Sequence, residues 1–120
     1  MATLEMVGPF EFTEKEINAK VSDDRIGNYA LGYISSGKQF VVCYVGRATE
    51  QGLRTRLKQH LGDHRDKFKF FKFSYSNTKV DAYLKECKNY HDFGGEKCLM
   101  NDIHPSKLEG DNTRCPFCNK

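Results

Sequence analysis

The chain has 120 residues, 38% of them hydrophobic, and a formal net charge of +3 at pH 7. This length suits one small domain spanning residues 1–120, and no stretch is long and apolar enough to cross a membrane. Five cysteines, an odd number, and the absence of a secretory signal argue against a disulfide framework and predict an intracellular protein, cytoplasmic or nuclear.

The first predicted element is a short helix. Residues 1–11 show no clear period and predict no element. Thr13-x-x-Glu16 is typical of a capping box, which predicts a helix that begins there and ends near Lys20. Ile17 and Val21 give this helix little apolar face. We therefore expect it to cover a sheet from the periphery.

A β-hairpin is predicted next, over residues 27–46. Two runs rich in aromatic and β-branched residues flank a turn at Ser36-Gly37-Lys38. Folding the chain at this turn places Tyr29 opposite Tyr44 and Tyr33 opposite Phe40. Since cross-strand partners share a face, Tyr29 and Tyr44 are expected side by side near the open end of the hairpin.

Two helices and one strand are predicted after the hairpin. Leu53, Leu57, His60 and Leu61 recur at helical spacing, and Gly62 is expected to end that helix. Residues 68–75 alternate Phe and Lys like a strand, and Asn77 can cap a helix over 78–92. The predicted fold class is α/β (α+β): a three-stranded antiparallel sheet flanked by helices. Its core would span about residues 25–95, followed by an irregular tail over 96–120.

Basic residues concentrate in the middle of the chain. Between Arg54 and Lys72 they clearly outnumber the acidic residues, which would attract a polyanion. A solvated basic face is the alternative interpretation. The residues predicted to bind nucleic acid are Arg47, Arg54, Lys58, Lys67 and Lys69.

Four short motifs follow one another in a characteristic order. They are Gly27-x-Tyr29, Tyr44-Val45-Gly46, Leu53-x-x-Arg56-Leu57-x-x-His60 and Ala82-x-x-x-Glu86. This order resembles the GIY-YIG nuclease family over residues 27–86. Two features depart from the family pattern: Asn28 stands where an aliphatic residue is usual, and the hairpin is long if Tyr29 is the first motif tyrosine. Tyr33 gives a more typical spacing with a poorer motif, so it stays open as the alternative to Tyr29.

The resemblance implies a divalent-metal-dependent endonuclease that hydrolyses phosphodiester bonds in DNA, with RNA left open as substrate. In that family Glu86 would be the ligand of Mg²⁺ or Mn²⁺, and one carboxylate can suffice because Mg²⁺ keeps most of its waters. Arg56 would stabilise the transition state, and Tyr29 would act as general base or orient the attacking water. Tyr44 would orient water or phosphate. His60 would bond Tyr29 or phosphate.

Tyr29 has a further requirement in this role. A free phenol has a pKa near 10, so Arg56 or the metal would have to lower it.

Other functions remain open from the sequence. The same scaffold could be a catalytically inactive nucleic-acid-binding module or a zinc-stabilised interaction module. Nucleic acid, with DNA preferred, is the expected partner, and no membrane is expected. No separate targeting region is visible, so a nuclease would depend on substrate shape or on a protein partner for targeting.

The C-terminal cysteines predict a structural zinc site that staples the tail. Cys115-x-x-Cys118 has the spacing of a zinc knuckle, and Cys87 and His91 lie one helical turn apart on the preceding helix. His104 is the alternative to His91, and Cys98 is a weaker substitute. Cys-x-x-Cys with an internal proline also fits a redox motif, although the βαβ context of such motifs is missing.

Overall fold

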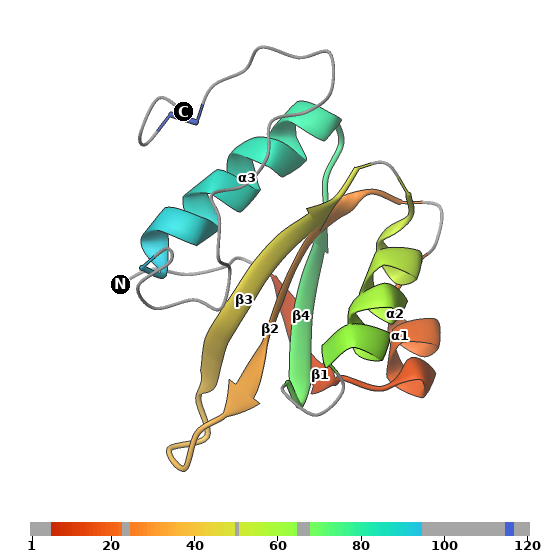
Figure 1. The fold of residues 1–120 in the computed structure, drawn as a ribbon, viewed down its shortest axis with the longest axis vertical. Coiled ribbons are helices and arrows are strands. Elements are labelled where there is room, and N and C mark those ends of the chain that lie inside the picture. The colour runs from red at the N-terminus through yellow and green to blue at the C-terminus, as the bar shows by residue number, and fades with distance from the viewer. Residues whose placement is uncertain (1–5, 23–24, 50, 65–67, 95–114, 117–120) are drawn as a thin grey trace.

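The computed structural model describes residues 6–22, 25–49, 51–64, 68–94 and 115–116, and Figure 1 draws their fold. The elements in chain order are β1 (Val7–Glu11), α1 (Glu14–Lys20), β2 (Gly27–Ile34), β3 (Phe40–Ala48), α2 (Leu53–His64), β4 (Phe70–Tyr75) and α3 (Lys79–Asp92). The strands form one antiparallel sheet in the order β1-β4-β2-β3. Strand β2 is therefore central, and β3 lies at one edge.

The α+β class is confirmed, but the prediction of three strands is wrong. The additional strand, β1, pairs with β4 and has Phe10 opposite Phe71. Its side chains are exposed except for the partly buried Phe10, and it contains Pro9. Proline is tolerated at a sheet edge, where one side of the strand needs no pairing.

The predicted hairpin is confirmed, but its register is wrong. Tyr29 pairs with Gly46, while Tyr44 pairs with Leu31. The register shifts between Leu31 and Gly32, where the β3 side has one extra residue, Cys43. Because residues two apart on a strand share a face, Tyr29 and Tyr44 still lie on the same face. They are diagonal rather than direct neighbours.

Helices cover both faces of the sheet (Figure 1). Helix α3 packs on β2 and β3 from one side, and α2 packs on them from the other with α1 beside it. The larger core lies on the α1 and α2 side. Its fully buried side chains include Ile17, Tyr29, Leu31, Leu53, Leu57, Phe68 and Phe71.

Local signals explain most helix boundaries. Thr13 caps α1 by accepting a hydrogen bond from the Glu16 amide at 3.2 Å, as predicted. Ile17 is nevertheless fully buried in the main core, so the expectation of a peripheral helix is wrong. Helix α2 continues past Gly62 to His64, and Thr78 rather than Asn77 caps α3.

None of the helices in the described part of the chain is long and apolar enough to span a bilayer.

Candidate active site

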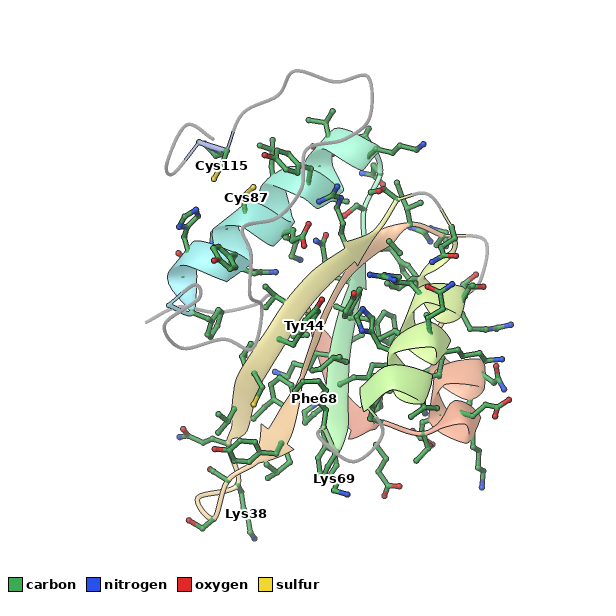
Figure 2. The ribbon with its side chains drawn as sticks, in the orientation of Figure 1. Lys38, Tyr44, Phe68, Lys69, Cys87 and Cys115 are labelled. Atoms are coloured by element: carbon green, nitrogen blue, oxygen red, sulfur yellow. The ribbon has the colours of Figure 1, made fainter. Side chains whose placement is uncertain are left out.

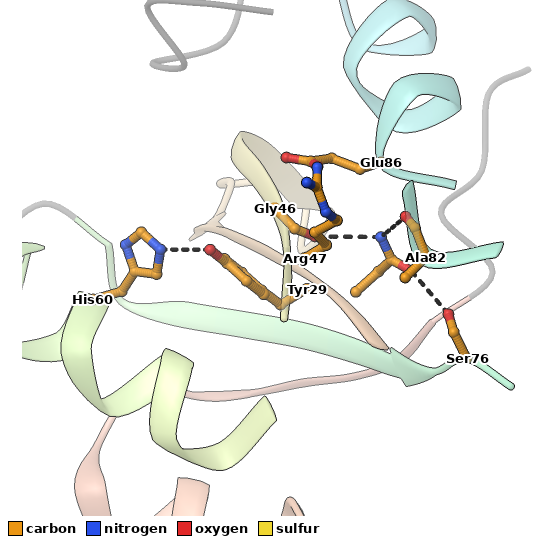
Figure 3. A network of polar contacts seen from close by, with 8 residues as sticks. Tyr29, Gly46, Arg47, His60, Ser76, Ala82 and Glu86 are labelled. Carbon is orange, nitrogen blue, oxygen red and sulfur yellow. Dashed lines mark hydrogen bonds and ion pairs between the residues drawn. The ribbon is translucent and has the colours of Figure 1, made fainter. Parts of the chain in front are cut away.

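Three aromatic rings from β2, β3 and α2 meet on one face of the sheet. The Tyr29 hydroxyl lies 2.5 Å from Nε2 of His60 in a buried hydrogen bond (Figure 3). The His60 ring centroid is 5.1 Å from those of both Tyr29 and Tyr44. The two tyrosine rings stack at 10°, with centroids 6.5 Å apart. The structure thus brings these three predicted site residues together.

Gly46 makes this arrangement sterically feasible. A Cβ atom at position 46 would fall on the hydroxyl and Cζ of Tyr29 and lie 2.9 Å from its Cε2. Tyr29 is 1% exposed, so its ring has little room to move away. The glycine that ends Tyr44-Val45-Gly46 is therefore required by the tyrosine ring that lies against it.

Tyr33, the alternative first tyrosine, lies elsewhere. Its side chain is 46% exposed near the hairpin turn, opposite Val41. Tyr29 is instead buried beside His60 at the other end of the hairpin. The geometry favours Tyr29 as the site residue.

Glu86 on α3 forms the second part of the site. Its carboxylate makes an ion pair with Arg47, and the two side chains are only 11% and 13% exposed (Figure 3). The Arg47 guanidinium also lies 5.2 Å from the ring centroid of Tyr83. Arg47 was predicted to contact nucleic acid, but in this structure it is the counter-ion of Glu86. The sequence offered one usable signal, a charged residue directly after Gly46 on a strand facing α3.

Arg56 connects the two parts electrostatically. It lies on α2 one helical turn before His60, with Nη1 donating to Gln59 Oε1 at 3.1 Å. Its positive charge lowers the pKa values of both Tyr29 and Glu86. A single guanidinium thus acts on the phenol and on the carboxylate.

Burial dominates the pKa values of both groups. It raises the pKa of Tyr29 well above its ordinary value, and Arg56 offsets only part of that rise. Burial likewise raises the pKa of Glu86, against the lowering by Arg47 and then Arg56. Removing water disfavours the charged form of each group. Tyr29 therefore keeps its proton at neutral pH, and Arg56 does not lower its pKa enough to make it a phenolate.

Asn28, the departure from the family motif, has a structural explanation. Its side chain is fully buried, and its Nδ2 donates to the Ala82 carbonyl of α3 at 2.9 Å. Its Oδ1 accepts from Ser76 Oγ at 3.1 Å (Figure 3). Ala82 lies one turn before Glu86, so Asn28 fixes the part of α3 that carries the carboxylate. An aliphatic side chain could not make these bonds.

The predicted nucleic-acid-binding residues differ in their surroundings. Arg54 is engaged within the protein, because its Nε donates to the Val21 carbonyl at 2.7 Å and its Nη2 to that of Asn18 at 3.3 Å. Lys69 is exposed and Lys58 is partly buried. Lys67 lies outside the described residues. Arg54 is therefore better explained as a link between α2 and α1.

The predicted zinc ligands are described only in part. Cys87 and Cys115 are free and buried in one cluster, and His91 is partly buried. Cys98, His104, Cys118 and most of the 96–120 tail lie outside the described residues. Within the described residues, no group of three or more metal-binding side chains comes together.

The redox alternative for these thiols has less chemical support. Burial raises the pKa of the Cys87 thiol to about 12, so it is not a nucleophilic thiolate at neutral pH.

Comparison of the chain with protein-family models, curated proteins and solved structures gave no match. The interpretation of the site therefore depends on its geometry and on the sequence motifs.

Proposed function

We propose that this chain is a divalent-metal-dependent endonuclease of GIY-YIG type that hydrolyses phosphodiester bonds in DNA. The observation that carries the proposal is the buried hydrogen bond between Tyr29 and His60, residues 31 positions apart in the sequence. It joins two of the motifs in a pairing suited to proton transfer. Arg56 and Glu86, from the other motifs, lie close enough to affect each other electrostatically.

The Tyr29–His60 pair supports a two-step proton path. Attack on phosphorus requires that a water molecule lose a proton. Tyr29 is protonated at neutral pH, since burial raises its pKa, so it needs its own proton acceptor. Neutral imidazole has a pKa near 6.5 and is a suitable acceptor. We propose that Tyr29 passes its hydroxyl proton to His60 Nε2 as the hydroxyl oxygen takes a proton from water.

Arg56 would act on the developing charge at phosphorus. Its planar guanidinium presents several donors that match phosphate oxygens. Its influence on both Tyr29 and Glu86 puts it where the nucleophile and the phosphate would meet. Removal of a single transition-state donor of this kind typically reduces kcat by ~10²–10³-fold.

Glu86 fits a hard divalent cation. The Arg47 pair engages Oε1 of its carboxylate, which has a second oxygen. Mg²⁺ and Mn²⁺ take oxygen ligands, and Mg²⁺ needs only one or two carboxylates besides water and substrate phosphate. Glu86 would hold this cation, which when bound supplies a Lewis acid at the phosphate. Arg47 would balance the charge of Glu86 in its absence.

The Arg47–Glu86 ion pair also favours a second candidate function, a catalytically inactive nucleic-acid-binding module. A carboxylate already neutralised by an arginine is a weaker metal ligand. In that case the scaffold would bind nucleic acid through Lys58 and Lys69 without cutting it. A protein partner would supply targeting under either function.

Cleavage assays distinguish the two functions. The protein is incubated with plasmid, branched DNA and RNA, with and without Mn²⁺. We expect Mn²⁺-dependent nicking that Glu86→Gln abolishes while DNA binding is retained. Glu11→Gln, an exposed carboxylate on β1, is the control that should cut normally. A fully active Glu86→Gln protein would refute the assignment of the carboxylate. Binding without cleavage of any substrate would establish the inactive module.

A further inference from the structure

Two cysteines from distant parts of the chain face each other on the outer side of α3. Figure 2 shows the sulfur atoms of Cys87, on α3, and Cys115 pointing toward one another. Both thiols are free and 0% exposed. They form a buried cluster with Tyr83, and Val80 and Leu84 pack against it. Few apolar side chains surround Cys115 besides these, so something must hold this short segment on the helix.

A hydroxyl beside these thiols also lacks a conventional partner. Tyr83 lies one helical turn before Cys87 and is fully buried. Its hydroxyl oxygen makes no conventional hydrogen bond in the structure. It lies next to the Cys87 sulfur, the polar group with which it interacts. A neutral thiol is a weak acceptor, whereas metal-bound thiolates are commonly oriented by donors in their outer shell.

We infer that Cys87 and Cys115 are two ligands of a structural zinc ion that fastens the C-terminal segment to α3. Zinc in structural sites takes four tetrahedral ligands, most often thiolates and imidazoles. Cys115 begins the Cys-x-x-Cys118 knuckle, which supplies a third sulfur by sequence spacing. His91, one turn after Cys87 on α3, or His104 would be the fourth ligand. This site lies outside the proposed catalytic residues.

The zinc site would share a wall with the candidate active site. The Tyr83 ring lies between Cys87 of the thiol cluster and the guanidinium of Arg47, whose distance from the ring centroid is 5.2 Å. Arg47 in turn pairs with Glu86, the residue before Cys87. Zinc binding would therefore steady the same turn of α3 that presents the carboxylate.

Metal analysis of the full chain tests the inference independently of nuclease activity. The protein is produced with zinc and reductant present, and its bound metal is quantified. We expect roughly one zinc per chain in the wild type. Cys43→Ser is the matched control, since Cys43 lies on β3 away from the cluster, and it should retain the metal. Cys87→Ser and Cys115→Ser should each lower the zinc content or affinity by about tenfold or more.

A second measurement on the unmodified protein covers the case in which the cysteine variants do not fold. Cobalt(II) replaces zinc in the wild type, and thiolate ligands would give a sulfur-to-cobalt charge-transfer absorption. Alkylation followed by mass spectrometry should then modify Cys87 and Cys115 faster after chelation, with Cys43 unchanged. The inference is overturned if the wild type lacks zinc, if it contains a Cys87–Cys115 disulfide, or if Cys115→Ser keeps the metal.

Discussion

The contact between Gly46 and Tyr29 gives the sharpest test of the site geometry. In Gly46→Ala the new methyl group would overlap the hydroxyl and Cζ of Tyr29 and approach Cε2 to 2.9 Å. Tyr29 is buried, so the ring or strand β3 must shift. Overpacking of this kind costs about 1–3 kcal/mol, and loss of the hydrogen bond to His60 adds about 1 kcal/mol. We expect the free energy of unfolding to fall by about 2–4 kcal/mol.

The same substitution elsewhere in the chain provides the control. A Cβ atom at Gly62, on α2, meets no atom within 4 Å. Gly62→Ala should therefore raise stability by about 0.5–1 kcal/mol, because alanine loses less backbone entropy in a helix. Both variants are compared by urea denaturation followed by circular dichroism, and by Mn²⁺-dependent nicking at matched folded fraction. If Gly46→Ala is as stable and active as Gly62→Ala, the proposed packing of Tyr29 against β3 is wrong.

The remaining predictions concern proton transfer, pH and salt. Tyr29→Phe should stay folded but lose ~10²–10⁴-fold in single-turnover cleavage, and unchanged rates would rule out the proton path through its hydroxyl. The folded-state pKa of Glu86 is raised above its ordinary 4.5, so its stabilising effect is present below that value and lost as pH rises through the folded pKa. Denaturation at a series of pH values should show wild type losing stability relative to Glu86→Gln as pH rises through this window, and parallel curves would contradict the shift. The slope of log K against log salt for duplex DNA should become shallower by about 0.9 in Lys58→Ala and Lys69→Ala if each contacts one phosphate. Arg54→Ala should chiefly lower stability, since its guanidinium bonds α1 carbonyls, and a steep change in slope would return Arg54 to the binding surface.

The sequence located the elements that have a strong period and missed the one that lacks it. The Leu53, Leu57, His60 and Leu61 stripe identified α2 because every one of these side chains is buried. Strand β1 left no such signal, because it lies at an edge and exposes nearly all its side chains. Its pairing with β4 is a long-range contact that local pattern cannot reveal.

The sequence also found most of the candidate site but not its connections. The motif order named Tyr29, Tyr44, Arg56, His60 and Glu86, and the structure places Tyr29, Tyr44 and His60 in contact. It could not show that Arg47 neutralises Glu86 or that Asn28 bonds α3, since both depend on which strand residues face that helix. The register error had the same origin. A single extra residue at Cys43 cannot be recognised from alternating hydrophobic residues alone.

The register of β2 has a consequence for how this chain can tolerate changes in length. Adjacent residues Asn28 and Tyr29 serve opposite faces of the central strand, one holding α3 and the other bonding His60. An insertion before them within β2 would exchange their faces and break both contacts at once. The turn between Ser35 and Gln39 lies at the other end of the hairpin, and its central residues, 36–39, are exposed. Residues added there would lengthen the hairpin without moving the site, which makes this turn the natural place to graft a peptide tag or a recognition loop.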